Sequence, residues 1–197
     1  MSNLEPEWLA QALKGDSDAF AQLVETYQKS VYNLCYRMLG DPDEAEDAAQ
    51  ETFLRAYRNL KHYDRQRLLS TWLLSIAAHY CIDQIRRRRF TVLSLDTLPQ
   101  LDVPDKSLEP EPSLVLNENQ KKVQDLLRSL NPQDRAAVVM LYWYDFASEE
   151  IGEALSMSIR AVKSCLHRAR RELAQHWMDQ GSPAILSERT RHESPAF

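Results

Sequence analysis

The chain has 197 residues and a mass of 22.9 kDa, enough for two domains of ~70–100 residues each. Its 44% apolar and 27% charged residues form a globular composition that excludes a wholly disordered chain, and its net charge is −5. The four glycines stand far apart, so GxGxxG and GxxxxGK[ST] loops are absent, which argues against a Rossmann or P-loop enzyme.

Three cysteines, Cys35, Cys81 and Cys165, are too widely spaced for a CxxC zinc motif and indicate small apolar core residues in a reducing compartment. The first ten residues, MSNLEPEWLA, lack the basic and apolar segments of a signal peptide. No apolar run approaches the length of a membrane span. We therefore expect a cytoplasmic protein without a membrane span, metal or cofactor.

Charge is segregated along the chain. Residues 1–60 hold eleven acidic and five basic side chains, whereas residues 61–95 hold two acidic and seven basic ones. Residues 96–120 hold six acidic side chains and one basic, and residues 158–177 hold one acidic and five basic. Two basic segments in an acidic chain predict local phosphate contacts, weak binding to bare DNA and dependence on a partner.

The first half of the chain is predicted to be helical. Between Asp16, an expected N-cap, and Gly40, an expected C′ residue, apolar side chains recur every three or four positions over five turns. Asp41, Pro42 and Glu44 then form a capping signature that begins a second helix. Its expected buried side is Ala45, Ala48, Ala49, Thr52, Phe53, Ala56 and Tyr57, and its acidic side is Asp43, Glu46, Asp47, Gln50 and Glu51.

A third helix is expected from about Ser70 to Arg89, ending in four consecutive arginines. Beyond it, four prolines among acidic residues show no helical period and predict a stiff, solvated linker. We expect an all-α protein of two small helical domains, with residues 1–95 as the first domain, 96–116 as the linker, 117–177 as the second domain and 178–197 as a flexible tail.

The second domain is predicted to end in a helix-turn-helix. Helices are expected near 118–130 and over 132–144, the latter begun by an Asn-Pro pair. A short helix over 148–155, capped by its first residue, is joined by the tight connection 156–158 to a last helix over 159–177. Two short helices joined by so few residues are typical of DNA-binding modules.

The last helix separates its polar and apolar sides almost completely. At 100° per residue, the apolar side chains of Val162, Cys165, Leu166, Ala169 and Leu173 lie opposite the polar ones. Arginine and lysine at such positions contact phosphates and guanine in the major groove, although a solvated basic face is the alternative. The candidate DNA-binding residues are Arg160, Lys163, Ser164, His167, Arg168 and Arg171.

Two further surfaces each have a functional and a structural interpretation. Trp72, beside the basic stripe of the third helix, could stack on unpaired bases or lie in the core. His79, Asp83 and Arg86 share a face that could meet base edges or form a solvated stripe. The acidic side of the second helix could dock on a basic partner helix or face solvent. Enzyme chemistry is not indicated, because the paired acidic residues have no predicted apolar pocket and the histidines lack metal-site spacing.

These segments resemble the sigma-70 superfamily of bacterial RNA polymerase sigma factors, in its extracytoplasmic-function (ECF) group. Residues 43–53, DEAEDAAQETF, are similar to region 2.2, and residues 70–88 are similar to regions 2.3 and 2.4. Residues 149–155 and 162–173 are similar to region 4.2. The resemblance covers about residues 10–177, with the motifs in the family's order.

The resemblance implies a sigma factor that binds core RNA polymerase and promoter DNA, with catalysis left to the polymerase. It assigns binding of the β′ clamp helices to Asp43, Glu46, Asp47, Gln50, Glu51 and Phe53. It assigns reading and melting of the −10 element to Trp72, His79, Asp83, Arg86 and Arg87, and reading of the −35 element to the last helix. It also implies a contact of the second domain with the polymerase β flap, control by an anti-sigma factor, and association with the nucleoid when the holoenzyme forms.

Two positions depart from the family pattern. His79 stands where many members have asparagine, and the connection 156–158 lacks the usual glycine or asparagine. Two other functions stay open on the residues alone. A polymerase-independent helix-turn-helix regulator would bind duplex DNA tightly as a dimer. An interaction adaptor would tolerate neutralisation of Arg160, Lys163 and Arg171.

Overall fold

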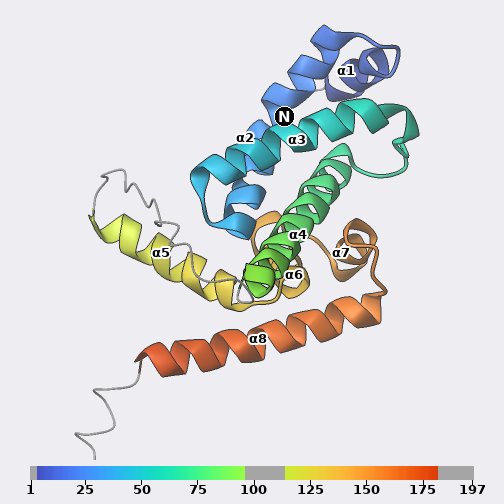
Figure 1. Ribbon diagram of the computed structural model, residues 1–197. Helices are drawn as coiled ribbons and strands as arrows, with labels where there is room; N and C mark the ends of the chain where they lie inside the picture. The colour runs from blue at the N-terminus through green and yellow to red at the C-terminus, as the bar shows by residue number, and fades with distance from the viewer. Residues whose placement is uncertain (1–3, 96–113, 182–197) are drawn as a thin grey trace, which may run out of the picture.

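The computed structural model describes residues 4–95 and 114–181, and every regular element in them is helical, which confirms the all-α prediction. The predicted linker lies outside these residues except for its last three positions, as do residues 182–197 of the predicted tail. Figure 1 shows the elements in order: α1 Glu5–Ala12, α2 Ser17–Leu39, α3 Pro42–Asn59, the 3₁₀ turn η1 Leu60–His62, α4 Leu69–Leu95, α5 Leu114–Ser129, α6 Pro132–Tyr144, α7 Ser148–Ala154 and α8 Ile159–Gly181.

Most helix boundaries follow from local capping chemistry. Asp16 Oδ1 accepts from the backbone N–H groups of Asp18 and Ala19 at 2.9 and 3.1 Å, and Asp41 Oδ1 accepts from that of Glu44 at 2.9 Å. Gly40 ends α2 in the left-handed region, with φ of 78°. These predicted caps are confirmed, because each depends only on neighbouring residues.

Two local predictions are wrong. Ala147, rather than Ser148, is the N-cap of α7, because the side chain of Glu150 accepts the Ala147 N–H at 2.7 Å. Tyr57 is 47% exposed rather than buried, although its ring still packs edge-on against Phe20, with centroids 5.0 Å apart. Helix α1 was not predicted; it packs against α2 and buries Ala12.

The core of the first half lies between α2, α3 and α4. Fully buried side chains of α2, including Val31 and Met38, pack against alanine-rich faces of α3 and α4. Small alanine side chains let helices approach closely, so this bundle is tightly packed. Cys35 and Cys81 meet in this core, where their hydrogen bond and burial raise the pKa of Cys81. With Cys165 also buried, the prediction of core cysteines is confirmed.

Helix α6 is the centre of the second half. Its residues from Asp134 to Met140 are all buried, because α7 and α8 cover one side of α6 while α2 and α4 cover the other. A helix that is apolar on all sides is typical of such an enclosed position. In Figure 1, α8 lies along the edge of the molecule opposite α1, with α6 between α8 and α4.

The C-terminal end of α2 is the main polar contact between the two halves. Its last carbonyls, which a helix leaves without intrahelical donors, accept from side chains of the second half. Gln124 Nε2 donates to Tyr36 O at 3.1 Å, Arg135 Nη1 to Met38 O at 2.5 Å and Arg128 Nη2 to Gly40 O at 3.0 Å. Two arginines also complement the negative end of the α2 dipole.

Three contacts extend this interface. Tyr144 Oη donates to Ser30 O at 2.5 Å, and the guanidinium of Arg37 lies 4.9 Å from the Trp143 ring centroid. Arg67, before α4, forms an ion pair with Glu153 of α7. The interface therefore combines buried hydrogen bonds with charge pairs at its edge.

The connection between α7 and α8 lacks the glycine or asparagine that is usual in the resembled family. The glycine that this backbone requires is Gly152, one turn earlier, inside α7. Ser156 adopts a left-handed conformation, with φ of 55°, where glycine or asparagine is usual. Gly152, inside α7, accepts the Met157 N–H at its carbonyl at 2.7 Å. A Cβ on Gly152 would lie 2.7 Å from Met157 O, so the chain returns over a position that only glycine can occupy.

Gly152→Ala should therefore destabilise the α7–α8 unit by about 2 kcal/mol, because the contacted atom is backbone and cannot rotate away. The change is measured as the free energy of unfolding in urea. Gly15→Ala is the control: Gly15 has a positive φ, 98°, so alanine there carries backbone strain, but no atom lies within 4 Å of the added Cβ. A cost no larger than that of the control would contradict the close approach.

Candidate nucleic-acid and protein interfaces

The predicted DNA-binding face of α8 is exposed along its whole length. All six of its candidate residues are exposed, whereas Val162, Cys165, Leu166 and Ala169 are buried, so the predicted division of the helix is confirmed. Ser164 Oγ donates to Arg160 O at 3.0 Å, which holds this hydroxyl against its own helix. A basic face on the second helix of a helix-turn-helix can enter a major groove.

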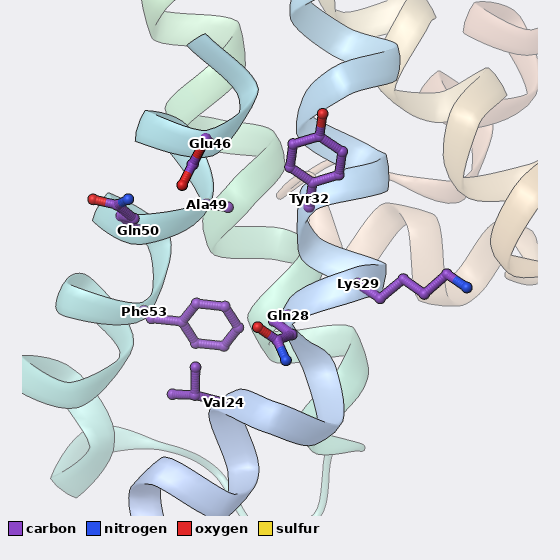
Figure 2. A pocket seen from close by; sticks show the side chains of 8 residues that line it. All are labelled: Val24, Gln28, Lys29, Tyr32, Glu46, Ala49, Gln50 and Phe53. Carbon is purple, nitrogen blue, oxygen red and sulfur yellow. The ribbon is translucent and has the colours of Figure 1, made fainter. Parts of the chain in front are cut away.

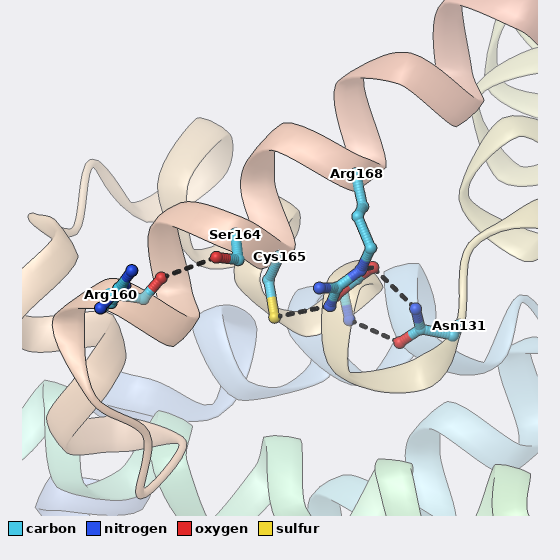
Figure 3. Close-up of polar contacts among 6 residues, drawn as sticks. Asn131, Arg160, Ser164, Cys165 and Arg168 are labelled. Carbon is cyan, nitrogen blue, oxygen red and sulfur yellow. Dashed lines mark hydrogen bonds and ion pairs between the residues drawn. The ribbon is translucent and has the colours of Figure 1, made fainter.

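Arg168 differs from its neighbours on this face. Its Nε and Nη2 donate to the two carboxylate oxygens of Asp134 on α6, at 3.1 and 2.8 Å. Nη2 also lies 3.2 Å from Cys165 Sγ (Figure 3). Hydrogen bonds and charge attraction from Asp134 raise the pKa of Arg168, and burial raises the pKa of Cys165 to about 11.

The polar face of α4 is also exposed. His79, Asp83, Arg86 and Arg87 are all exposed, as one face of the helix. The Nδ1 atom of His79 lies 2.8 Å from Ser75 O, and because a carbonyl only accepts, Nδ1 must donate. The other ring nitrogen, Nε2, is not used in this contact.

Trp72 combines both interpretations considered for it. It is half-buried and packs on Tyr63, with ring centroids 5.0 Å apart and planes at 51°. The hydroxyl of Tyr63 in turn donates to Arg67 O, which holds the loop before α4. The indole is therefore partly packed against the core and partly exposed, in the first turn of the helix that ends in the four arginines.

The acidic side of α3 borders a groove against α2. Asp43, Glu46, Asp47 and Gln50 are exposed, whereas Glu51 is half-buried and forms an ion pair with Arg55 at 2.7 Å. Phe53 is half-buried rather than fully buried. The groove, of about 480 Å³, is lined by Val24, Gln28, Lys29, Tyr32, Glu46, Ala49, Gln50 and Phe53, with the Phe53 ring on its floor beside Val24 (Figure 2).

One acidic residue of α3 points elsewhere. Glu44 forms an ion pair with Arg88, within the four arginines that end the basic segment of α4. This ion pair joins α3 to α4 through two residues that lie outside the predicted acidic side and the predicted −10 set. Arg55 continues this contact by lying over the Tyr80 ring, 4.7 Å from its centroid.

Comparisons with known proteins identify both halves. The family model of Sigma-70 region 2 matches residues 23–91, and that of Sigma-70, region 4 matches residues 120–173. The ECF RNA polymerase sigma factor SigW of Bacillus subtilis (strain 168) is 38% identical over 179 residues, covering 87% of this chain and 95% of SigW. The chain belongs to the ECF group of the sigma-70 family.

Other relatives agree with this assignment. The ECF RNA polymerase sigma factor BldN of Streptomyces coelicolor is 31% identical over 170 residues, which cover 86% of this chain and 64% of BldN. The solved structure of CnrH in complex with the cytosolic domain of CnrY has a TM-score of 0.65 at 23% identity, covering 91% of this chain and all of that one, and supports the same fold.

As an ECF sigma factor, the protein binds core RNA polymerase and directs promoter-specific transcription initiation. The polymerase-independent regulator is not favoured. The exposed α8 face belongs to region 4, and the α3 and α4 faces belong to region 2. Within the described ranges, no helix is both long and apolar enough to cross a membrane, and no three His, Cys, Asp or Glu side chains are grouped as metal ligands.

Three buried polar residues that join α5 and α6 to α2, and α6 to α8, were not predicted from the sequence. Gln124, Asp134 and Arg135 are buried, and each has a partner that lies 34 to 97 positions away in the chain. The available signal was the Asp-Arg pair at the start of an otherwise apolar helix. Charged residues are seldom fully buried without partners, so this pair indicates specific polar contacts if the helix is buried. It does not indicate which residues are the partners.

Proposed function

We propose that α3 forms the polymerase-docking surface of this sigma factor. Asp43, Glu46, Asp47 and Gln50 form an exposed acidic strip next to the groove floored by Phe53. The strip fits the basic helices of the β′ clamp by charge, and the groove fits an apolar side chain from them. Glu51, paired with Arg55, fixes the edge of this surface. Charge complementarity of this kind favours fast, oriented association.

We propose that α4 and α8 read the two promoter elements. Trp72, with its exposed edge, stacks on an unpaired base of the −10 element, while His79 and Asp83 offer hydrogen-bonding groups and Arg86 and Arg87 offer positive charge. Arg160, Lys163, Ser164, His167, Arg168 and Arg171 face the −35 major groove. The observation that carries this assignment is that both polar faces are exposed in one chain whose relatives are sigma factors.

The proposal extends to domains, partners and location. Residues 1–95 and 117–177 are the two working domains, joined by the segment 96–116 and followed by the tail 178–197. The chain has no catalytic activity of its own, acts in the cytoplasm at the nucleoid, and also contacts the polymerase β flap. The sigma factor RpoE of Bartonella quintana, 22% identical with a TM-score of 0.62, is bound to the anti-sigma factor NepR, which supports control by such a partner here.

Run-off transcription tests the proposed function. Core polymerase is assayed with and without the protein on fragments from upstream of its own gene. Discrete new starts that require the protein are expected, and their shared upstream sequences define the two elements. Duplex binding without polymerase and without new starts would indicate a simple regulator, and neither activity would indicate an adaptor.

Reversing charge on the α3 strip should weaken polymerase binding at least ten-fold, because like charges would then face the clamp. The variant is Glu46→Lys with Asp47→Lys, and the measurement is competition for core polymerase against the labelled wild-type protein. Glu25→Lys, at an exposed acidic position of α2 outside the strip, is the control and should bind as the wild type does. Equal affinities of the two variants would contradict the docking surface.

A further inference from the structure

Asp134 is a carboxylate with no exposure, in the first turn of α6. Its Oδ1 accepts from Arg168 Nη2 at 2.8 Å. Its Oδ2 accepts from Arg168 Nε at 3.1 Å and from Asn131 Nδ2 at 2.7 Å. The Asp134 N–H donates to Asn131 Oδ1 at 3.0 Å. The carboxylate is therefore held in one orientation by its own helix start and offers both oxygens to α8.

The Arg168 side chain is fixed by contacts within the protein but remains largely exposed. Two of its nitrogens contact Asp134, and Nη2 also contacts Cys165 Sγ at 3.2 Å, yet 57% of the side chain is exposed. Figure 3 shows the guanidinium extending from α8 across Cys165 towards Asn131. A planar guanidinium bound along one edge keeps its other edge, with Nη1, directed away from the carboxylate.

The neighbouring cations on the α8 face have no such support. Within the described part of the chain, the side chains of Arg160, Lys163 and Arg171 form no hydrogen bond or ion pair with another side chain, and all three are exposed. A long side chain that is free in solution loses rotamer freedom when it binds, whereas one already fixed loses less. Arg168 is therefore the cation on this face best prepared for a contact of fixed geometry: Nε and Nη2 are engaged, and Nη1 is held ready to donate to a base acceptor such as guanine O6 or N7.

We propose that Asp134 is a specificity-determining positioning residue, which fixes the plane of the Arg168 guanidinium so that its outer edge reads one base pair of the −35 element. This inference rests on the proposed function of α8. Arg160, Lys163 and Arg171 supply charge to the phosphates, while Arg168 supplies sequence discrimination. Asp134 acts through Arg168 and touches no DNA itself.

The proposal predicts an effect opposite to simple electrostatics. A carboxylate near DNA repels phosphates, so its removal would by charge alone strengthen binding to every promoter alike. If Asp134 positions Arg168, its removal instead weakens recognition at one base pair. Arg168→Lys should behave in the same way, because lysine keeps the charge but cannot span both carboxylate oxygens and at the same time hold a further donor in a fixed plane.

The experiment uses holoenzyme and a set of promoters in which each −35 base pair is substituted in turn. Wild-type protein should discriminate about ten-fold at the base pair that Arg168 reads, and Asp134→Asn and Arg168→Lys should both lose discrimination at that pair only. Arg170→Lys, at an exposed position of the same helix outside the six proposed DNA-binding residues, is the control and should keep the wild-type profile. In a plot of the logarithm of the promoter-binding constant against the logarithm of salt concentration, the slope should become shallower by about 0.9 for Arg171→Ala. The slope should stay unchanged for Asp134→Asn.

Three outcomes overturn the inference. The first is that Asp134→Asn keeps the wild-type profile. The second is that Asp134→Asn raises transcription from all promoters alike. The third is that Arg168→Lys keeps discrimination at the base pair in question. If Asp134→Asn does not fold, as its melting curve would show, Arg168→Lys on the exposed face decides the question. If no −35 substitution affects the wild-type protein, the proposed function of α8 fails and the positioning role fails with it; retained −35 sensitivity in Arg168→Lys overturns the positioning role alone.

Discussion

Replacing Arg135 with alanine should lower the free energy of unfolding by about 3 kcal/mol, because several buried carbonyls would lose their donor together. Arg135 is 4% exposed on α6. Its Nη1 donates to Met38 O at 2.5 Å, and its Nη2 donates to Arg128 O at 2.9 Å and to Leu130 O at 3.3 Å. One side chain thus serves the ends of α2 and α5 at once.

The effect should also change how the protein unfolds. Arg135 holds region 4 on region 2, so its loss should separate one cooperative transition in urea into two, with region 4 released first. Arg128→Ala is the control, since Arg128 is exposed and donates to only one α2 carbonyl, that of Gly40. Its expected cost is below about 1 kcal/mol. Equal costs for the two variants, measured by circular dichroism, would contradict the anchoring role of Arg135.

The parts of the fold that sequence predicted are those fixed by near neighbours. Asp16, Gly40 and Asp41 act within four residues of their own positions, so their capping contacts can be predicted from the neighbouring sequence. The division of α8 into basic and apolar sides is likewise a matter of helical period. The capping of α7 was misassigned for a local reason: Glu150 accepts the Ala147 N–H, so the helix begins one residue earlier than Ser148 would begin it as an N-cap.

The parts that sequence did not predict depend on contacts distant in the chain. The apolar surface around the whole of α6 did carry a signal, because a helix without a polar side must be enclosed on both faces. This pattern did not predict that α2 and α4 are the helices that pack on the second side of α6. In the same way, the helical period of the sequence predicted that Arg168 is exposed. Its contact with Asp134 could be seen only in the folded structure, where α6 and α8 lie side by side.

Under the proposed assignment of the two promoter elements to α4 and α8, the distance between these helices should increase several-fold when the protein moves from its free state to a promoter complex. In the structure α6 packs against both α4 and α8, so their axes are separated by about two packing distances, ~20 Å. Elements centred about 25 base pairs apart are ~85 Å apart along DNA at 3.4 Å per pair. One compact molecule cannot contact both, so region 4 must leave region 2.

Energy transfer between two labels measures this separation. The buried Cys35, Cys81 and Cys165 should not react with the dyes, so new cysteines at Lys61 and Glu149 can be labelled. Lys61 lies in η1 and Glu149 in α7, and the nearby Arg67–Glu153 ion pair brings these segments together in the free protein. High transfer is expected for the free chain, and a large loss once core polymerase and promoter are added.

Two comparisons make the result specific. A pair of labels at Lys61 and Glu25, both within region 2, should show no change on complex formation. Arg135→Ala should lower transfer in the free protein, since it removes the donor that joins α6 to the end of α2. Unchanged transfer between regions 2 and 4 in a transcribing complex would mean that the contacts of Gln124, Arg128 and Arg135 persist there, and that the two elements are not read by α4 and α8 of one chain.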